Sequence, residues 1–509
     1  MNIFQFLIGI FHHPRIDASR REGYAYAALA LAAGLLVVAI RFVAPVLPVF
    51  DNGFFMPLAW SIKNGFGMEN DWANPIQSAF YSWHGIVHPR IVAALSPGAT
   101  WFDINIGNAL VGALTVMLAV CTAWSLRIGL AATTAITAVM VSVTLNFQAR
   151  PEMTAAALLF LLMLANIGFP PSGRRWTAGA IMTGLLMGVL AVAQPTFLIL
   201  ASLGFAIFAL FDLRLSAAPF KRALLYSAIA VPLSLLAALG SIALLYDHPI
   251  PALIEGIYLH SRMISGTTSD TPYATYWIAS RFLPFAVLSL AVALLPLIYG
   301  FRVMMKDARV ILTLLYALAV ALFVLCLWNF SFTKPDTYYN AFGCLPMGLL
   351  LAAAIAARQR SGGIAVFLAI AMLPAATAAI GADVLMLWHG LASRQQASIA
   401  RQGVHDTLQR LVQAGHDVGA NRGTLAALER DDKAVMDKIR FENFVEDIVA
   451  DPRKPLPDYI VGLQAQDGHG VPVALKGYRV IENHYQPATA PLMNKPFNLS
   501  YALYQKVPD

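Results

Sequence analysis

Asp51 stands directly after the first long apolar segment of this chain and is followed by Asn52, Gly53 and two phenylalanines. Two further acids, Glu69 and Asp71, lie in the same loop. A carboxylate at the edge of a membrane can take the proton of an attacking hydroxyl group, which is general-base catalysis. We therefore predict Asp51 as a catalytic base, with Glu69 and Asp71 as a second acidic cluster. The alternatives are an acid that ends a helix in water and a solvated turn.

Basic side chains in loops on the same side of the expected membrane form a second set of candidates. Cations placed beside a departing anionic group stabilise the negative charge that develops on it. The candidates for binding such a group are Lys334, Arg150, Arg90, His88, Arg262 and Arg281. For Lys334 the alternative is an interfacial lysine that extends toward lipid headgroups. For Arg90 the alternative is an anchor beside the membrane.

Glu152, Tyr338 and Tyr339 are the candidates for substrate binding. Glu152 lies two residues after Arg150, so the two side chains either act on a substrate or pair with each other and shape the loop. The tyrosines could stack on a sugar ring, but aromatic side chains are also common as anchors at membrane interfaces. The sequence has no phosphate-binding glycine loop, no zinc-ligand spacing and no serine nucleophile elbow.

The elements that must carry these residues are transmembrane helices. Hydrophobic residues make up 58% of the 509 residues, charged residues make up 12%, and the mean hydropathy is +0.63. A water-soluble domain of this size could not place such a composition on its surface. Apolar windows of about 18 to 25 residues recur, each long enough to cross a hydrocarbon core of about 30 Å. We expect a polytopic α-helical membrane protein of about eleven transmembrane helices. The expected spans are residues 24–48, 104–126, 129–145, 153–169, 176–194, 196–212, 222–245, 282–301, 309–329, 340–357 and 363–388.

Basic residues are distributed unevenly between alternate loops. If the N-terminus is cytoplasmic, the inside segments hold 14 lysines and arginines, and the outside loops before residue 390 hold 6. The inside group is Arg15, Arg20, Arg21, Arg127, Arg174, Arg175, Arg214, Lys221, Arg222, Arg302, Lys306, Arg309, Arg358 and Arg360, and the outside group is Lys63, Arg90, Arg150, Arg262, Arg281 and Lys334. Because cytoplasmic loops carry an excess of basic residues, we predict a multi-pass protein of a bacterial inner membrane with a cytoplasmic N-terminus.

The composition changes sharply after the last expected span. Residues 390–509 are rich in charge, begin with an amphipathic helical pattern (Ile399, Leu408, Leu411 and Val412), and continue into strand-like runs at 458–461 and 499–504. With a cytoplasmic N-terminus, an odd number of crossings places this segment on the outer side of the membrane. We predict a transmembrane module over 1–389, with long periplasmic loops at about 49–103 and 246–281, and a small mixed α/β periplasmic domain over 390–509.

Several segments together resemble the GT-C superfold of glycosyltransferases. The resemblance rests on residues 51–55, on residues 148–153 before the fourth expected span, on residues 332–339, and on residues 477–480 and 501–504. The segment 332–339 looks like the lysine-bearing outer loop of bacterial arabinosyl- and aminoarabinosyltransferases. The run His88, Pro89 and Arg90 occupies the place of a Lys-Pro-Pro stretch in the aminoarabinose transferases.

The resemblance implies an inverting transfer of a sugar from a polyprenyl-phosphate donor to an envelope glycan or glycolipid acceptor, such as lipopolysaccharide, at the periplasmic face. It also implies that the basic candidates named above bind the donor phosphate. Membrane lipids are the expected surroundings. The net charge of +7 comes mostly from the inside loops, so we expect no nucleic-acid partner. Some relatives show two adjacent acids where this chain has Asp51 and Asn52. The binding of a divalent cation is therefore an open alternative, and no other cofactor is expected.

Two functions of other classes compete with the transferase. One is a transporter or flippase for an envelope lipid, and the other is a non-catalytic membrane protein that binds glycan. Within the enzyme class, a ligase that moves a whole lipid-linked glycan is a third possibility. The sequence has no internal repeat and few ionisable residues deep in the spans, which disfavours a transporter.

The charge distribution predicts the side on which residue 398 lies. A cysteine introduced by Ser398→Cys should react with a membrane-impermeant thiol reagent added to intact cells from the periplasmic side. The parent chain, whose three cysteines lie within apolar segments, is the control. Labelling of the variant only after lysis would contradict the odd number of crossings.

Overall fold

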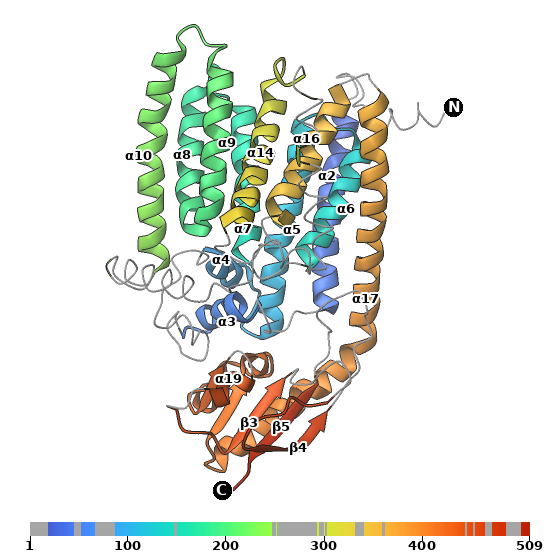
Figure 1. The fold of residues 1–509 in the computed structure, drawn as a ribbon, viewed down its shortest axis with the longest axis vertical. Coiled ribbons are helices and arrows are strands. Elements are labelled where there is room, and N and C mark those ends of the chain that lie inside the picture. The colour runs from blue at the N-terminus through green and yellow to red at the C-terminus, as the bar shows by residue number, and fades with distance from the viewer. Residues whose placement is uncertain are drawn as a thin grey trace.

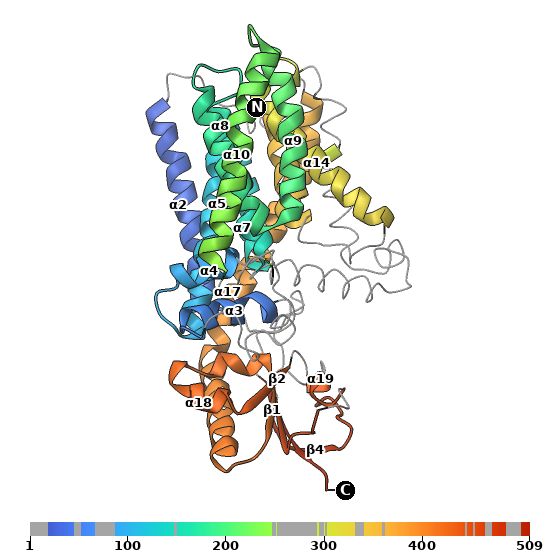
Figure 2. The ribbon, with the colours of Figure 1, turned by 90° about the vertical axis from the view of Figure 1, so that its left-hand side faces the viewer.

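The chain folds as a helical bundle with a small sheet domain at one end (Figure 1). This computed structural model describes residues 19–44, 52–66, 87–146, 150–246, 303–330, 340–358, 362–442, 445–450, 454–463, 471–484 and 500–508, together with residues 251, 293–294 and 300. We call the end of the bundle that faces the sheet domain the domain end, and the opposite end the far end. The two ends are also clear when the molecule is turned by 90° (Figure 2).

Within the described ranges, seven helices are long and apolar enough to cross a membrane. These stretches are Gly23–Val43, Trp101–Ser125, Pro151–Gly168, Trp176–Ala193, Pro195–Leu213, Pro219–Leu245 and Ala308–Leu325, and two shorter apolar helices cover Leu130–Leu145 and Phe342–Arg358. The chain is therefore a multi-pass membrane protein of mostly helical structure. The expected number of about eleven spans stays a prediction, because the expected span 282–301 lies mostly outside the described residues.

The bundle helices begin and end close to the expected positions. They are α2 (Ser19–Val43), α5 (Trp101–Ser125), α6 (Leu130–Asn146), α7 (Pro151–Gly168), α8 (Trp176–Ala193), α9 (Pro195–Leu213), α10 (Pro219–Leu245), α14 (Ala308–Phe330) and α16 (Leu345–Arg358), the last preceded by a π-helical turn, η2 (Asn340–Cys344). Pro151, Pro195 and Pro219 each occupy a first helical position, where the missing amide hydrogen costs nothing.

One continuous helix joins the bundle to the sheet domain. α17 (Gly362–Gln413) has 52 residues, so the expected boundary at residue 390 falls inside it. Leu408, Leu411 and Val412 are buried as the amphipathic pattern predicted, whereas Ile399 is 65% exposed. From Ser398 onward, the first buried side chain of α17 is that of Val404, so the buried face begins after Ile399.

The C-terminal domain is a five-stranded mixed sheet of order β2-β1-β3-β5-β4. Its strands are β1 (Val418–Asn421), β2 (Ile439–Glu442), β3 (Tyr459–Leu463), β4 (Tyr478–His484) and β5 (Tyr501–Lys506). β1 pairs in parallel with β2 and β3, and β5 pairs antiparallel with β3 and β4. Short helices complete the domain: η3 (Arg422–Ala427), η4 (Arg430–Asp432), α18 (Lys433–Met436) and α19 (Val445–Ala450). The two strand-like runs of the sequence correspond to β3 and β5.

The sheet domain rests on the helices of the first long loop. This loop forms α3 (Asn52–Lys63) and α4 (Val87–Leu95) at the domain end. The 3₁₀-helix η3 contacts both α3 and α5. The Lys433 ammonium group of α18 lies 5.9 Å from the centre of the Phe66 ring, a distance at which a cation is attracted by the ring. The domain therefore closes over the end of the bundle where α3 and α4 lie.

A glycine lets α4 approach α5 closely. An ideal Cβ atom at Gly107 of α5 would lie 2.4 Å from the Val92 carbonyl oxygen and 2.3 Å from the Ser96 hydroxyl oxygen of the adjoining segment. No side chain fits at that distance from a backbone oxygen. Gly107 thus determines how deeply α4, and with it His88, sits in the bundle.

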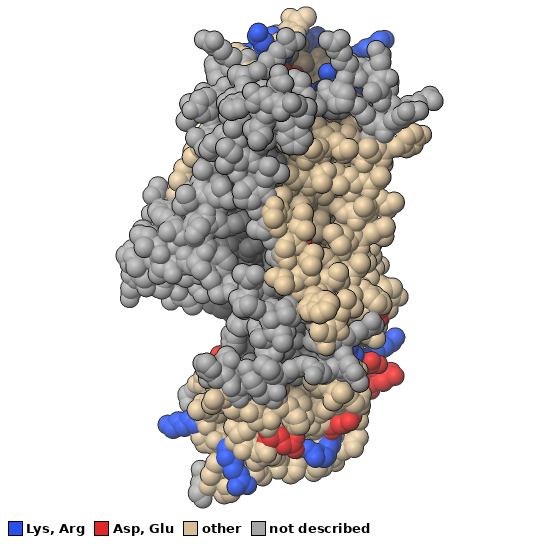
Figure 3. Space-filling model, turned by 90° about the vertical axis from the view of Figure 1, so that its right-hand side faces the viewer, with Lys and Arg blue, Asp and Glu red and all other residues tan. Residues whose placement is uncertain are grey.

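Basic residues gather at the far end. The turns and helix termini there carry Arg127, Arg174, Arg175, Arg214, Lys221, Arg222, Lys306, Arg309 and Arg358. Figure 3 shows lysines and arginines at the far end, both signs of charge on the sheet domain, and a mostly uncharged described surface between them on this face. An uncharged band between two charged ends is the pattern of a protein that crosses a lipid bilayer.

Replacing Gly107 tests this packing. Gly107→Ala should lower the thermal unfolding temperature of the purified protein, because overpacking typically costs about 1–3 kcal/mol. Gly240→Ala on α10 is the control, since a Cβ atom there meets nothing within 4 Å and alanine favours a helix. An equal change in both variants would contradict the close approach of α4.

Candidate functional site

The first turn of α7 holds two of the predicted site residues next to each other. Arg150 is the residue before the helix, Pro151 is its first residue, and Glu152 follows. The positive end of the helix dipole lies here, which stabilises a carboxylate in the first turn. Glu152 is 1% exposed, so this charge needs partners inside the protein.

Two side chains supply those partners. The Arg150 Nε atom lies 3.3 Å from Glu152 Oε2, and an Arg150 terminal nitrogen lies 3.5 Å from Glu152 Oε1. The Gln194 amide, which precedes α9, donates to Glu152 Oε1 at 2.9 Å. The carboxylate therefore links the starts of α7 and α9, and it is compensated by Arg150.

Arg150 is the member of this group that reaches the surface. Its side chain is 17% exposed, against 2% for that of Glu152. The guanidinium carbon lies 5.8 Å from the centre of the Phe55 ring of α3, within the range of a cation–π contact. Glu152 and Phe55 both contact this guanidinium group, so its position is restricted.

His88 of α4 lies beside the same turn of α7. Its Nδ1 atom lies 2.9 Å from the Thr154 hydroxyl oxygen, and the imidazole is 1% exposed. Burial lowers the pKa of His88 to about 3, because a charged ring would lose its water; a hydrogen bond with Asn108 opposes the shift and the Arg150 charge adds to it. The ring is therefore neutral at physiological pH, and its contact with Thr154 joins α4 to α7.

Arg90 connects α4 to a different helix. Its Nε atom donates to the carbonyl oxygen of Leu245, the last residue of α10, at 3.1 Å. A cation is favourable at a helix C-terminus, where unpaired carbonyl groups gather. Arg90 thus ties the first long loop to the end of α10, where the second long loop begins.

The structure brings together three of the predicted site residues, His88, Arg150 and Glu152, and it places Arg90 on the same helix as His88 but against the end of α10. Their roles in binding stay predictions. The other candidates lie outside the described residues, namely Asp51, Glu69, Asp71, Arg262, Arg281, Lys334, Tyr338 and Tyr339. Asp51 immediately precedes the first residue of α3, Asn52, in the same loop as α4.

Sequence reasoning missed three polar residues that hold the cluster: Gln194, Thr154 and Asn108. All three are buried, and each lies within or beside an apolar segment of the sequence. A polar side chain in such a segment is usually hydrogen-bonded within the protein. That signal indicates that these residues are buried, but it does not identify the partner that each one contacts.

Over the part of the chain that the structure describes, no three His, Cys, Asp or Glu side chains come together in a way that could hold a metal ion. Asp51, Glu69 and Asp71 lie outside that part.

Two crystal structures of ArnT from Cupriavidus metallidurans are similar to this chain. The structure bound to undecaprenyl phosphate matches with a TM-score of 0.53 and 13% sequence identity, over 95% of this chain and 98% of the ArnT chain. The chain has a GT-C-like fold. The apo-state ArnT structure gives a TM-score of 0.50 at the same identity and coverage. No protein-family model matches the sequence, and a search of curated proteins gives no match.

The buried neutral imidazole predicts a pH dependence of stability in this GT-C-like fold. The folded-state pKa of about 3 lies below the ordinary value of about 6.5. Between these values the unfolded chain binds more protons, so stability is fully present above about pH 6.5 and falls as the pH decreases. The loss from this group is at most about 1.4 kcal/mol per pH unit.

His88→Asn removes the titrating group and should flatten the dependence of the unfolding temperature on pH between about 6.5 and 4. Thr154→Val is the matched control: it deletes the hydroxyl partner but keeps the buried imidazole, so the slope should persist at a lower stability. Parallel curves for the parent chain and His88→Asn would contradict the burial of a neutral ring.

Proposed function

We propose that the chain is a membrane glycosyltransferase that transfers a sugar from a polyprenyl-phosphate-linked donor to an envelope glycan or glycolipid. The observation that carries this proposal is a GT-C-like fold over 95% of the chain, combined with the cluster of Arg150, Glu152 and His88 at the domain end. The similar ArnT structure contains undecaprenyl phosphate, a polyprenyl phosphate of the proposed donor class.

The proposed orientation places the domain end in the periplasm of a bacterial cell. The far end carries most of the basic residues of the described turns, and cytoplasmic loops are enriched in such residues. The chain would then present α3, α4 and the sheet domain to the side on which envelope glycans are assembled.

The proposed reaction is a single inverting displacement. The acceptor hydroxyl oxygen attacks the anomeric carbon of the donor sugar, and its proton passes to the Asp51 carboxylate. The bond between the anomeric carbon and the phosphate oxygen breaks, and polyprenyl phosphate leaves with the electron pair. If Glu69 or Asp71 takes the proton instead, the balance of bonds is unchanged.

The cations of the domain end would stabilise the departing phosphate. Arg150 is the described cation best placed for this role, because Glu152 and Phe55 restrict it while its side chain stays partly exposed. Lys334, Arg262 and Arg281 are further proposed phosphate contacts. For Arg90 and His88 we propose positioning roles, since Arg90 bonds the end of α10 and His88 bonds Thr154. Glu152 holds Arg150, and Tyr338 and Tyr339 are proposed to bind the sugar.

A transfer assay in detergent separates this proposal from a transporter. The purified protein is mixed with a labelled polyprenyl-phosphate sugar and a lipopolysaccharide acceptor, and labelled product is measured. Micelles enclose no second compartment, so a flippase gives no product, whereas a transferase does. A glycan-binding protein would retain acceptor without transferring label.

Asp51→Asn tests the base. The substitution keeps the size of the side chain but removes its basicity, so transfer should slow by at least about a hundredfold while donor binding is retained. Asp437→Asn is the control, because Asp437 forms an exposed ion pair with Lys433 and such pairs contribute little. Near-normal turnover of Asp51→Asn with an inactive Glu69→Gln or Asp71→Asn would move the base to the second cluster. Full activity in all three variants would refute the mechanism.

A further inference from the structure

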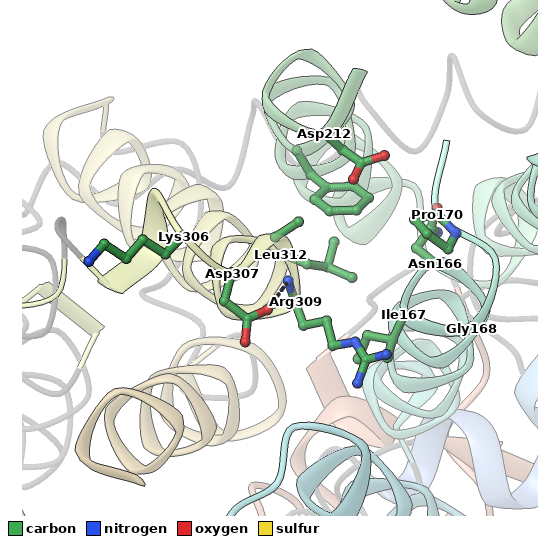
Figure 4. A pocket seen from close by; sticks show the side chains of 11 residues that line it. Asn166, Ile167, Gly168, Pro170, Asp212, Lys306, Asp307, Arg309 and Leu312 are labelled. Atoms are coloured by element: carbon green, nitrogen blue, oxygen red, sulfur yellow. Dashed lines mark hydrogen bonds between the residues drawn. The ribbon is translucent and has the colours of Figure 1, made fainter. Parts of the chain in front are cut away.

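A cavity of about 280 Å³ lies at the far end of the bundle (Figure 4). It includes the end of α7, whereas Arg150 and Glu152 lie at the start of that helix. It is formed by the end of α7, the end of α9 and the start of α14, together with the turn before α14. Its size is close to the lower end of the range for small-ligand sites, about 300–1,000 Å³. No step of sugar transfer uses it.

Apolar side chains form the deep wall of this cavity. Phe208 of α9 and Leu312 of α14 line it and are almost completely buried, and Ile167 of α7 lies beside them. Asn166 also lines the cavity, but its amide is occupied within the bundle: it donates to the Leu162 carbonyl oxygen and to Thr183. The inner part of the site therefore offers mainly apolar contact.

Both acids that line the cavity have hydrogen-bond partners of their own. Asp307 Oδ2 accepts from Arg358 Nε at 2.7 Å, and Asp307 Oδ1 accepts from the Arg309 backbone amide at 3.0 Å. Asp212 Oδ2 accepts from the Ser172 backbone amide at 2.6 Å. These carboxylates hold helix termini and turns in place. With Arg358 included, three cations (Lys306, Arg309 and Arg358) surround two carboxylates, so the cavity and its partner carry a net positive charge.

Two cations, Arg309 and Lys306, also line the cavity. Their side chains make no hydrogen bond and no ion pair with any described residue, and both residues are exposed. In Figure 4 the Arg309 side chain extends across the cavity toward Ile167 and Gly168, whereas Lys306 points away from α7. The cavity thus has an unpaired guanidinium group over an apolar wall.

We propose that this cavity binds the phosphodiester headgroup of an anionic phospholipid. Arg309 would pair with the phosphate in a charge-assisted contact, Lys306 would add charge at the rim, and the glycerol end of the lipid would contact Phe208 and Leu312. Basic pockets between transmembrane helices bind such headgroups in other membrane proteins. A zwitterionic lipid fits less well, because its amine would add a positive charge where Lys306, Arg309 and Arg358 already outnumber Asp212 and Asp307.

The position of the cavity favours a lipid over a soluble anion. α7 has 18 residues and so extends for about 27 Å, which is near the thickness of the hydrocarbon core. With the start of α7 at one membrane surface, its end at Gly168 lies at the other surface, at the depth of lipid phosphates. This inference does not rest on the proposed sugar transfer.

The test is lipid binding to the purified full-length protein, measured by native mass spectrometry with phosphatidylglycerol and with phosphatidylcholine. The parent chain should retain phosphatidylglycerol more tightly. Arg309→Ala should weaken phosphatidylglycerol binding by at least about fivefold, the effect of one cation near a membrane surface, and Arg309→Lys should restore most of it. The matched charge control is Arg175→Ala, which removes an exposed arginine of the same end that does not line the cavity.

A second variant fills the mouth of the cavity and leaves its charges unchanged. A Cβ atom at Gly168 meets nothing within 4 Å, so Gly168→Leu should fold normally and cover the cavity mouth, with a loss of at least about tenfold in binding. Gly240→Leu is its control, since the same substitution there also meets open space. Equal binding of the two lipids, or equal losses in a variant and its control, would overturn the proposal. Displacement of the lipid by millimolar inorganic phosphate would assign the cavity to a soluble anion instead and would also overturn it.

Discussion

The hydrocarbon layer penalises a buried polar group that lacks a partner inside the protein, and that constraint shapes both ends of the bundle. Arg41, buried in α2, donates to the carbonyl oxygens of Ala44 and Leu145 and interacts electrostatically with Asp383 of α17. Asn166, Thr183 and Tyr226 form a closed set of hydrogen bonds between α7, α8 and α10. These contacts satisfy polar atoms where water is absent, and they leave the helix ends as the places where chemistry can occur.

At the domain end, one carboxylate organises the site. The Glu152 carboxylate can be buried because Arg150, Gln194 and the start of α7 compensate its charge. Removing any one partner would leave a buried charge, which is far more costly than losing an exposed ion pair. The same arrangement restricts Arg150, whose contact with Phe55 brings in α3. A group that stabilises the fold therefore also orients the cation that we propose for phosphate binding.

The sequence predicted the parts of the fold that depend on hydrophobicity, and it missed those that depend on contacts between particular polar side chains. The limits of α7, α8 and α9 agree with the expected spans within a few residues, because lipid requires about 20 apolar residues whatever the neighbouring helices are. The continuity of α17 through residue 390 was not expected, since a change from apolar to charged composition marks a change of solvent and does not by itself end a helix. In the site, the pairing of Arg150 with Glu152 was one of two alternatives that their spacing allowed. The contact of His88 with Thr154 joins residues 66 positions apart, and no local pattern contains it.

The length of α7 links the two ends of the molecule. Glu152 and Thr154 lie at its start, and Asn166 to Gly168 lie at its end, so its 18 residues separate the proposed transfer site from the far-end cavity by about one membrane thickness. α9 makes the same crossing, from Gln194 beside Glu152 to Asp212 beside the cavity. Because packed helices transmit displacement with little compression, the depth of these two helices in the bilayer determines the height of both sites at once. A headgroup held at the far end would then fix the depth of α7 and α9, and with it the height of Arg150, Glu152 and Gln194 at the domain end.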